Sequence, residues 1–279
     1  MKYFTSRLVY LQLIILIIGI VTFGCKKEKK TVFSTQEQQA FTTLKVNLER
    51  SIADLELTGS KIARFFLPPG ISEEKMRSYL IAGVEGRDYI VACGLISPDG
   101  IMLYVEPEEY QKPEGLNLSN SDKYLYVKEK SETYITPILI SPAGVLLQEY
   151  LLPVYNAGNQ FLGVMTILVD TAKLLDFRHL IPDLNTINLL VFDTDGELIF
   201  NNRTRKLGGG NLKGLNAEGA EELIALIKRA EAEESGTSYY HIFDDQYDME
   251  FMYYAQWISA KLPGRSWRIF MNTEYEIEE

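Results

Sequence analysis

Histidine and cysteine are scarce in this sequence, which contains two of each. His179 and His241 lie far apart in the chain, and neither is close to a cysteine or to a spaced set of acidic residues. No zinc site is therefore expected. The Gly-x-Ser-x-Gly pattern of a nucleophile elbow is also missing. These absences predict a protein that is not an enzyme and has no catalytic residue, metal site or cofactor.

The sequence also lacks a basic stripe. Its formal net charge is −10, and removal of residues 1–24, which carry two positive charges and no negative one, leaves −12. An acidic protein without clustered basic residues is not expected to bind nucleic acid. The one lysine-rich segment, residues 26–30, could lie against anionic lipid headgroups instead.

A long apolar run occurs only near the N-terminus, at residues 8–23. Lys2 and Arg7 precede it, which is the order of an export signal. As a helix, this run would span roughly 24 Å, less than the ~30 Å hydrocarbon core of a bilayer. The pattern favours a cleaved signal peptide over residues 1–24. The alternative, an uncleaved signal anchor, is opposed by the lysines that follow the run.

The end of this segment, Gly24-Cys25, resembles the lipobox of bacterial lipoproteins, in which the cysteine is acylated and becomes the new N-terminus. Thr22 and Phe23 differ from the usual lipobox residues. The resemblance implies lipid attachment at Cys25, a tether over residues 25–33, and a place in the bacterial cell envelope, on its periplasmic or extracellular face. Cys93 lies in an apolar run and is expected to be a buried strand residue.

A long helix is predicted over residues 34–71. Ser34 and Glu37 have the spacing of a capping box, and Pro68-Pro69-Gly70 would end the helix. A second helix is predicted from Ser72 to Gly83, with Met76, Leu80 and Ile81 at helical spacing. The apolar residues of the long helix recur at spacings of three, four and seven: Phe41, Leu44, Leu48, Ile52, Leu55, Ile62 and Phe65.

Two similar hairpins follow, about 95 residues apart in the chain. Strands at 89–97 and 101–105 flank Pro98-Asp99-Gly100, and strands at 189–192 and 198–200 flank an Asp-Thr-Asp-Gly-Glu turn. A helical or irregular stretch and three further strands follow each hairpin. This repetition predicts an α+β fold with two copies of one module. The further strands are expected at 134–140, 145–154, 160–168, 236–243, 249–258 and 267–273.

The hairpin from Leu152 to Asp170 resembles the extracellular double-Cache (dCache) sensor family. The likeness rests on Pro153-Val-Tyr155, on Phe161-Leu-Gly-Val164 and on the acidic Asp170 at the end. Matching segments occur in the second half of the chain. The resemblance implies a long N-terminal helix followed by two PAS-like (Cache) modules, each an antiparallel sheet with flanking helices: a membrane-distal module at 72–180 and a membrane-proximal module at 181–279.

The resemblance also implies a small-molecule pocket in the distal module. In amino-acid-binding members, a basic residue holds the ligand carboxylate and an acidic residue receives its ammonium group. These positions fall on Lys123 and Asp170. Tyr126 matches a family aromatic, whereas Leu118 and Leu125 stand where the family has aromatic residues.

Lys123 could hold a carboxylate as a point charge, without the forked geometry of arginine. Three further tyrosines are candidate walls of the pocket: Tyr124, Tyr134 and Tyr155. For each tyrosine the alternative is packing within a sheet. For Lys123 the alternative is a solvated charge.

These expectations give a lipid-anchored sensor or binding protein for a small polar metabolite, a carboxylate or an amine. No apolar run follows residues 269–271, so signalling would need a membrane partner such as a receptor or a transporter. The alternative is a structural or interaction lipoprotein without a working pocket. The long helix could also form a homodimer, or its apolar stripe could pack on the sheets instead.

Overall fold

The computed structural model describes residues 33–65, 70–175, 187–193, 196–201, 210–211, 221–244 and 249–275. The chain divides into two compact units, residues 1–38 and 39–279. The predicted signal peptide, Cys25, most of the tether and the predicted module boundary at residue 180 lie outside the described residues. So do His179 and Pro68-Pro69.

The two predicted helices are present. Helix α2 spans Thr35–Phe65 and α3 spans Glu73–Val84. The capping box forms as expected, because Ser34 N donates to Glu37 Oε2 and Glu37 N donates to Ser34 Oγ. Ser72 caps α3 by accepting from Lys75 N. None of the described helices is long and apolar enough to cross a membrane.

The apolar stripe of α2 is buried over most of its length, including Leu44, Leu48 and Leu55. Two predicted members of the helical stripes differ. Phe65 is exposed at the end of α2 and stacks on Tyr79, with 3.9 Å between ring centroids. Ile81 is exposed on α3. Periodicity alone therefore overestimates the burial of these two side chains.

The first sheet is antiparallel, in the order β2-β1-β6-β5-β3, with β4 also paired to β5. The β1–β2 hairpin lies where the turn residues predict it, and the β5–β6 hairpin lies where the family resemblance implies one. A short 3-10 helix, η1 (Glu108–Tyr110), follows β2. The strands of this sheet are β1 (Ile90–Ile96), β2 (Met102–Glu106), β3 (Tyr134–Ile135), β4 (Leu139–Ile140), β5 (Leu146–Tyr155) and β6 (Phe161–Asp170).

The strand predicted at 134–140 is wrong as a single element. It is divided into β3 and β4, which pair with different parts of β5. Pro137 lies in the break and has no N–H to donate to the ladder, which accounts for the interruption. The hairpin from β4 to β5 leaves Leu139 and Ile140 more than half exposed.

The second sheet has the order β10-β11-β12-β7-β8-β9. Helix α6 (Glu221–Ala232) packs on it through a core that includes Leu226, Ile227, Trp257 and Phe270. The strands of this sheet are β7 (Asn188–Phe192), β8 (Glu197–Asn201), β9 (Gly210–Asn211), β10 (Ser235–Asp244), β11 (Met249–Leu262) and β12 (Arg265–Glu274).

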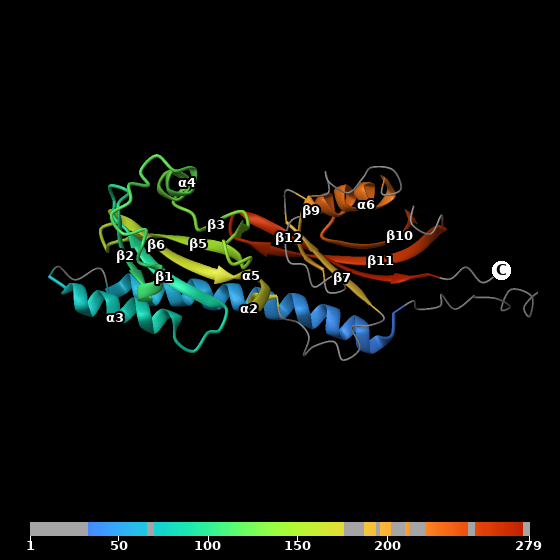
Figure 1. Ribbon diagram of the computed structural model, residues 1–279, viewed down its shortest axis with the longest axis horizontal. Coiled ribbons are helices and arrows are strands. Elements are labelled where there is room, and N and C mark those ends of the chain that lie inside the picture. Colours follow the sequence, from blue (N-terminus) through green and yellow to red (C-terminus); the bar gives the residue numbers. More distant parts are fainter. Residues whose placement is uncertain are drawn as a thin grey trace, which may run out of the picture. The chain divides into compact units, whose positions relative to one another are not determined.

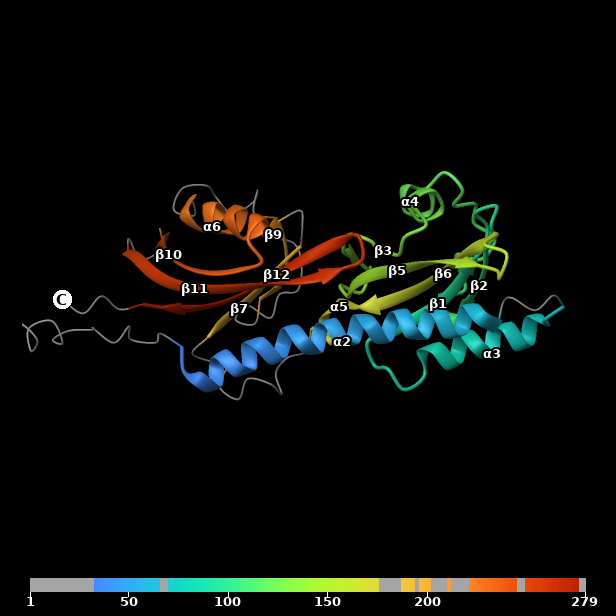
Figure 2. The same cartoon turned by 180° about the vertical axis from the view of Figure 1, so that it is seen from behind.

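The two sheets repeat one arrangement, which confirms the two modules inferred from the sequence. The two sheets have corresponding strand orders: β2-β1-β6-β5-β3 in the first and β8-β7-β12-β11-β10 in the second. Each strand in the first order therefore has a counterpart at the same place in the second. In each module a helix lies over one face of the sheet: α4 (Asp122–Lys130) in the first and α6 in the second (Figures 1 and 2). The part of α2 after Gln38 lies on the opposite face of the first sheet from α4 (Figure 1).

The turn between β11 and β12 contacts the edge of the first sheet. Ile135 N donates to Pro263 O (3.3 Å), and Arg265 Nε donates to Ile135 O (2.9 Å). Strand β3 therefore has β5 on one side and this turn on the other. Arg265 also forms an ion pair with Asp193, and both side chains are buried. The second module thus extends the hydrogen bonding of the first sheet.

Candidate ligand-binding site

The candidate residues gather on the face of the first sheet that α4 covers. Successive residues of a strand point to opposite faces. Tyr150 and Leu152 of β5 face α2, so Glu149 and Leu151 face α4. The register pairs Glu149 with Leu168 and Leu147 with Asp170, which places Leu168 and Asp170 on the α4 face as well. We call this side of the sheet the α4 face. It consists of α4 and the side chains of Glu149, Leu151, Leu168 and Asp170.

The centre of the α4 face is a closed apolar core. Tyr124 and Val127 of α4 pack there on Ile96, Leu151 and Val164. Half-buried side chains surround this core, and they include the sequence-predicted Tyr126 and Tyr134. Polar groups that could contact a ligand therefore lie around the apolar centre. Leu118 belongs to the same margin and offers an apolar contact only.

Lys123 lies in the first turn of α4 and does not point freely into solvent. Its Nζ forms an ion pair with Glu149 of β5, and the two side chains are only 27% and 13% exposed. Glu149 is fixed by backbone pairing to Thr136, since Thr136 N donates to Glu149 O and Glu149 N donates to Thr136 Oγ1, both at 2.9 Å. The basic position of the site thus already has an internal carboxylate partner.

Asp170 ends β6 and caps the short helix α5 (Thr171–Leu174). Its Oδ1 accepts from the backbone N–H groups of Ala172 and Lys173. Lys173 Nζ lies 3.9 Å from Oδ2, but the Lys173 side chain is half exposed, so solvent screens this contact. The Asp170 side chain is 11% exposed. The acidic position therefore has a structural role in addition to any role toward a ligand.

Tyr126 and Tyr134 form a pair at the margin of the α4 face, with ring centroids 4.7 Å apart. Tyr126 Oη donates to Glu132 Oε2 at 3.3 Å. The β11–β12 turn approaches the same pair, because a Cβ atom on Gly264 would come within 2.9 Å of Tyr134 Cδ2. The pair thus lies between the α4 face and the second module.

The other two candidate tyrosines have firm structural contacts. Tyr124 is fully buried, and its Oη donates to Pro98 O at 2.6 Å, which ties α4 to the β1–β2 turn. Tyr155 is half buried; its Oη donates to Ser131 Oγ at 2.6 Å, beyond the end of α4. Direct ligand contacts by any of the four tyrosines stay predictions.

Glu149 is the charged residue of this face that the sequence interpretation missed. It lies within the strand Leu146–Tyr155, whose other residues on both faces are mostly apolar or aromatic. A carboxylate in a strand that is covered on both sides needs a partner, because burial of an unpaired charge is costly. That mismatch is the signal that could have identified it.

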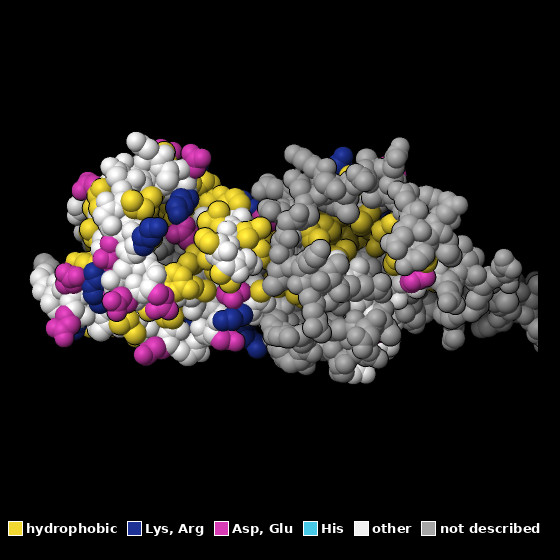
Figure 3. All heavy atoms as spheres, viewed as in Figure 1, with side chains coloured by type: hydrophobic (Ala, Val, Ile, Leu, Met, Phe, Trp, Pro, Cys, Tyr) yellow, Lys and Arg dark blue, Asp and Glu magenta, His cyan; other side chains and the backbone are white. Residues whose placement is uncertain are grey.

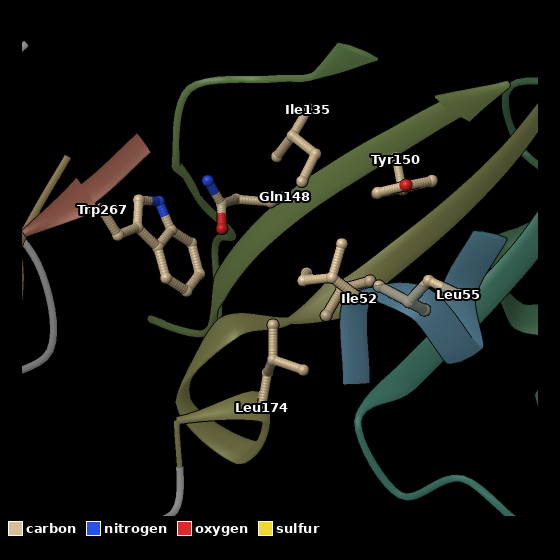
Figure 4. Close-up of a pocket in the computed structure, with 8 residues that line it drawn as sticks. Ile52, Leu55, Ile135, Gln148, Tyr150, Leu174 and Trp267 are labelled. Carbon is tan, nitrogen blue, oxygen red and sulfur yellow. The ribbon is translucent and has the colours of Figure 1, made fainter. Parts of the chain in front are cut away.

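Two small spaces lie on the opposite face of the first sheet. A cavity of about 10 Å³ lies between α2, β5 and Trp267 of β12, and it has space for about one water molecule. Figure 4 shows Trp267 beside Gln148 at one end of this cavity and Tyr150 with Leu55 at the other. A shallow groove of about 170 Å³ lies further along β5, beside Gly59 and Arg64 of α2. Neither brings together the sequence-predicted Lys123, Tyr126 and Asp170.

The described surface of the first module carries basic, acidic and apolar side chains side by side (Figure 3). Among the described residues, no group of three or more histidine, cysteine, aspartate or glutamate side chains could hold a metal ion. Cys93 is a buried free thiol, as the sequence predicted, and burial raises its pKa to about 12. A thiol held in its protonated form is a poor nucleophile.

Part of the chain matches a known protein family. Residues 55–171, less than half of the chain, match the family of HK/GC/chemotaxis protein-like sensor domains. The match contains α3, α4, the whole first sheet and Lys123, Glu149 and Asp170. No curated protein sequence matches the chain.

Solved structures extend the likeness over both modules. An extracellular ligand-binding receptor from Desulfohalobium retbaense aligns with a TM-score of 0.68 and 15% identity, over 87% of this chain but only 41% of the receptor chain. The ligand-binding domain of a Pseudomonas aeruginosa amino acid chemoreceptor, solved with GABA, aligns with a TM-score of 0.59 and 16% identity, over 85% of this chain and 95% of that domain.

The periplasmic sensory domain of a Campylobacter jejuni chemoreceptor gives a TM-score of 0.58 at 16% identity, over 85% of this chain and 91% of that domain. At such low identities the likeness establishes the fold. The chain has the fold of the Cache-type sensor domains, with a long helix and two PAS-like modules, as the sequence resemblance implied.

Proposed function

We propose that this protein is a sensor or binding protein that captures a small polar metabolite, a carboxylate or an amine, outside the cytoplasmic membrane. The observation that carries the proposal is the placement of Lys123, Glu149 and Asp170 on the α4 face, within the segment that matches the sensor-domain family. Structures with this fold have been solved with GABA and with isoleucine bound. Both ligands carry one ammonium group and one carboxylate.

The module that contains the α4 face, predicted at residues 72–180, would be the membrane-distal one, and the module at 181–279 would be membrane-proximal. Acylated Cys25 would hold the protein at the cell envelope through the tether at 25–33. Ligand state would then pass to a membrane receptor or transporter. Homodimer formation through α2 stays part of this proposal, because α2 exposes Val46 and Leu57.

Ligand capture can be tested with a panel of metabolites and thermal unfolding. A ligand that binds the folded state raises the apparent stability by about 2.7 kcal/mol at 100 times its dissociation constant. We expect a concentration-dependent rise in Tm with at least one carboxylate, amine or amino acid. If no carboxylate, amine, amino acid or nucleobase raises Tm, the structural or interaction lipoprotein becomes the better interpretation.

Site variants should then locate the binding. If the panel finds an amino acid as ligand, Lys123→Ala and Asp170→Asn should each weaken its binding by at least about tenfold, because each removes a charge that would pair with it. Asparagine replaces aspartate because Asp170 caps α5 and an asparagine Oδ1 can still accept from the backbone. Unchanged affinity in both variants would place the pocket elsewhere.

The anchor has a separate test. Mass spectrometry of the protein from the membrane fraction should find a mature N-terminus at Cys25 that carries acyl chains. Cys25→Ala should abolish acylation. An intact segment 1–24 in that fraction would instead support the uncleaved signal anchor.

A further inference from the structure

The carboxylate of Glu149 changes what the basic position of the candidate site can do. Lys123 is the residue that would receive a ligand carboxylate, yet its Nζ is paired with Glu149 across the α4 face. Both side chains are mostly buried, so water screens their attraction less than at an open surface. A ligand carboxylate would have to share Lys123 with a carboxylate that the protein already holds there.

Asp170 adds a second negative charge to the same face. In the register of β5 and β6, Glu149 lies opposite Leu168, and Asp170 is two residues further along β6. Such diagonal neighbours lie about 7–8 Å apart in a regular antiparallel pair. The two carboxylate side chains are 13% and 11% exposed. A spacing of about 7–8 Å is within the length of one short ligand.

The charges of this region do not balance. Glu149 and Asp170 contribute two negative charges, whereas Lys123, whose Nζ pairs with Glu149, contributes one positive charge. Lys173 approaches Asp170 only at 3.9 Å through a half-exposed side chain, which contributes little. A ligand that brings a positive charge would balance the region, and a ligand that brings only a negative charge would add to the excess.

We propose that Glu149 is a specificity-determining residue of this site, and that it selects ligands bearing an ammonium group, amines and amino acids, over plain carboxylates. The inference rests on the proposed function. An ammonium group adds hydrogen bonds to Glu149 without displacing Lys123, because a carboxylate has about four acceptor positions. The carboxylate of an amino acid is tolerated because its ammonium group compensates for it.

Titration calorimetry with three matched probes and their shorter and longer homologues tests this selectivity. Butylamine carries the cation, butyrate carries the anion, and GABA carries both on a chain of similar length. We expect the wild-type protein to bind the amines or the amino acids at least about tenfold more tightly than the matched carboxylates. Glu149→Gln keeps the shape and removes the charge, and it should reduce that preference by about tenfold.

Glu129→Gln is the control, because it removes the same charge from an exposed position of α4. Its preference for amines and amino acids over matched carboxylates should equal that of the wild type. Equal affinities for matched amines and carboxylates, or an unchanged preference in Glu149→Gln, would overturn the inference. If only purely anionic carboxylates of the wider panel bind, this inference fails while the proposed function stands. If only neutral metabolites bind, both fail. If nothing in the panel binds, both fail.

Discussion

At the scale of single residues, charged side chains around the first sheet are held by defined partners. Arg87 donates from Nε to Asp54 Oδ2 at 2.5 Å and from a terminal nitrogen to Asp54 Oδ1 at 3.1 Å. Tyr89 Oη donates to the same carboxylate at 3.0 Å. The hydrogen bond from Arg87 is the main reason that the pKa of Asp54 is lowered. Burial, with the Asp54 contact, raises the pKa of Tyr89 to about 12.

This contact predicts a pH dependence of stability. A lowered pKa in the folded state stabilises the protein above the unfolded value of 3.8, and the stabilisation is lost as the pH falls through the folded pKa. Asp54→Asn should therefore be less stable than the wild type at neutral pH, and equally stable at strongly acid pH. Because 35% of the Asp54 side chain is exposed, the difference at neutral pH should be below about 1 kcal/mol.

Urea unfolding at a series of pH values from neutral to about pH 2 measures the effect. Asp99→Asn, in the exposed β1–β2 turn, is the control and should keep the wild-type pH dependence. If Asp54→Asn also kept it, the Arg87 contact would not contribute to stability.

At the scale of elements, the β5–β6 hairpin explains the glycine of the motif Phe161-Leu-Gly-Val164. Gly163 has φ +135°, and a Cβ atom there would overlap the carbonyl oxygen of Ile96 on β1. Only glycine lets β6 approach β1 so closely at this point. The register shifts between Val154 and Tyr155 in the same hairpin, opposite Gly163 and Phe161. The glycine of the motif therefore has a structural explanation, independent of ligand binding.

Gly163→Ala should lower the free energy of unfolding by about 2 kcal/mol or more, because the new methyl group meets backbone that cannot rotate away. Chemical denaturation measures it. Gly158→Ala in the connection of the same hairpin is the matched control. Its nearest atom would be Asn156 Oδ1 at 3.3 Å, so a change below about 1 kcal/mol is expected. Equal losses in both variants would contradict this explanation.

At the scale of the whole molecule, the two modules are joined by specific contacts at β3. The β11–β12 turn bonds to both backbone groups of Ile135, and Trp267 is fully buried beside the cavity that Gln148 and Ile135 line. Arg265 links the modules, because it bonds to Ile135 O and forms an ion pair with Asp193, which is 1% exposed. The candidate tyrosine pair therefore contacts an element that belongs to the other module.

Arg265→Met should destabilise the protein by about 3 kcal/mol, because the buried Asp193 carboxylate loses this cation. Adding Asp193→Asn should recover part of the loss, since the charge is then removed as well. Denaturant unfolding of the three variants measures both effects. Lys261→Met near the same turn removes an ion pair with Glu234 whose two side chains are more than 70% exposed, and it should leave stability unchanged. A loss in Arg265→Met no larger than in Lys261→Met would overturn this account.

Much of the fold was predictable because its determinants are local. The capping box of α2, its apolar stripe and the turn residues of both hairpins act between neighbours in the chain, and the structure contains the elements that they predict. The interruption of 134–140 was missed, although Pro137 marks it, because the residues on either side have strand composition. The exposure of Phe65 and Ile81 was missed because periodicity gives the direction of a side chain and not the extent of the surface it meets.

The sequence by itself determined the α+β architecture, the duplication and the identity of Lys123, Tyr126 and Asp170 as candidates, because periodicity, turn chemistry and a family motif are written in consecutive residues. The tertiary structure alone decided which partners these residues have. Lys123 meets Glu149, twenty-six positions away in the chain, and Tyr134 meets Gly264 of the other module. Strand register and helix packing set such contacts, and they arise only when distant segments fold together.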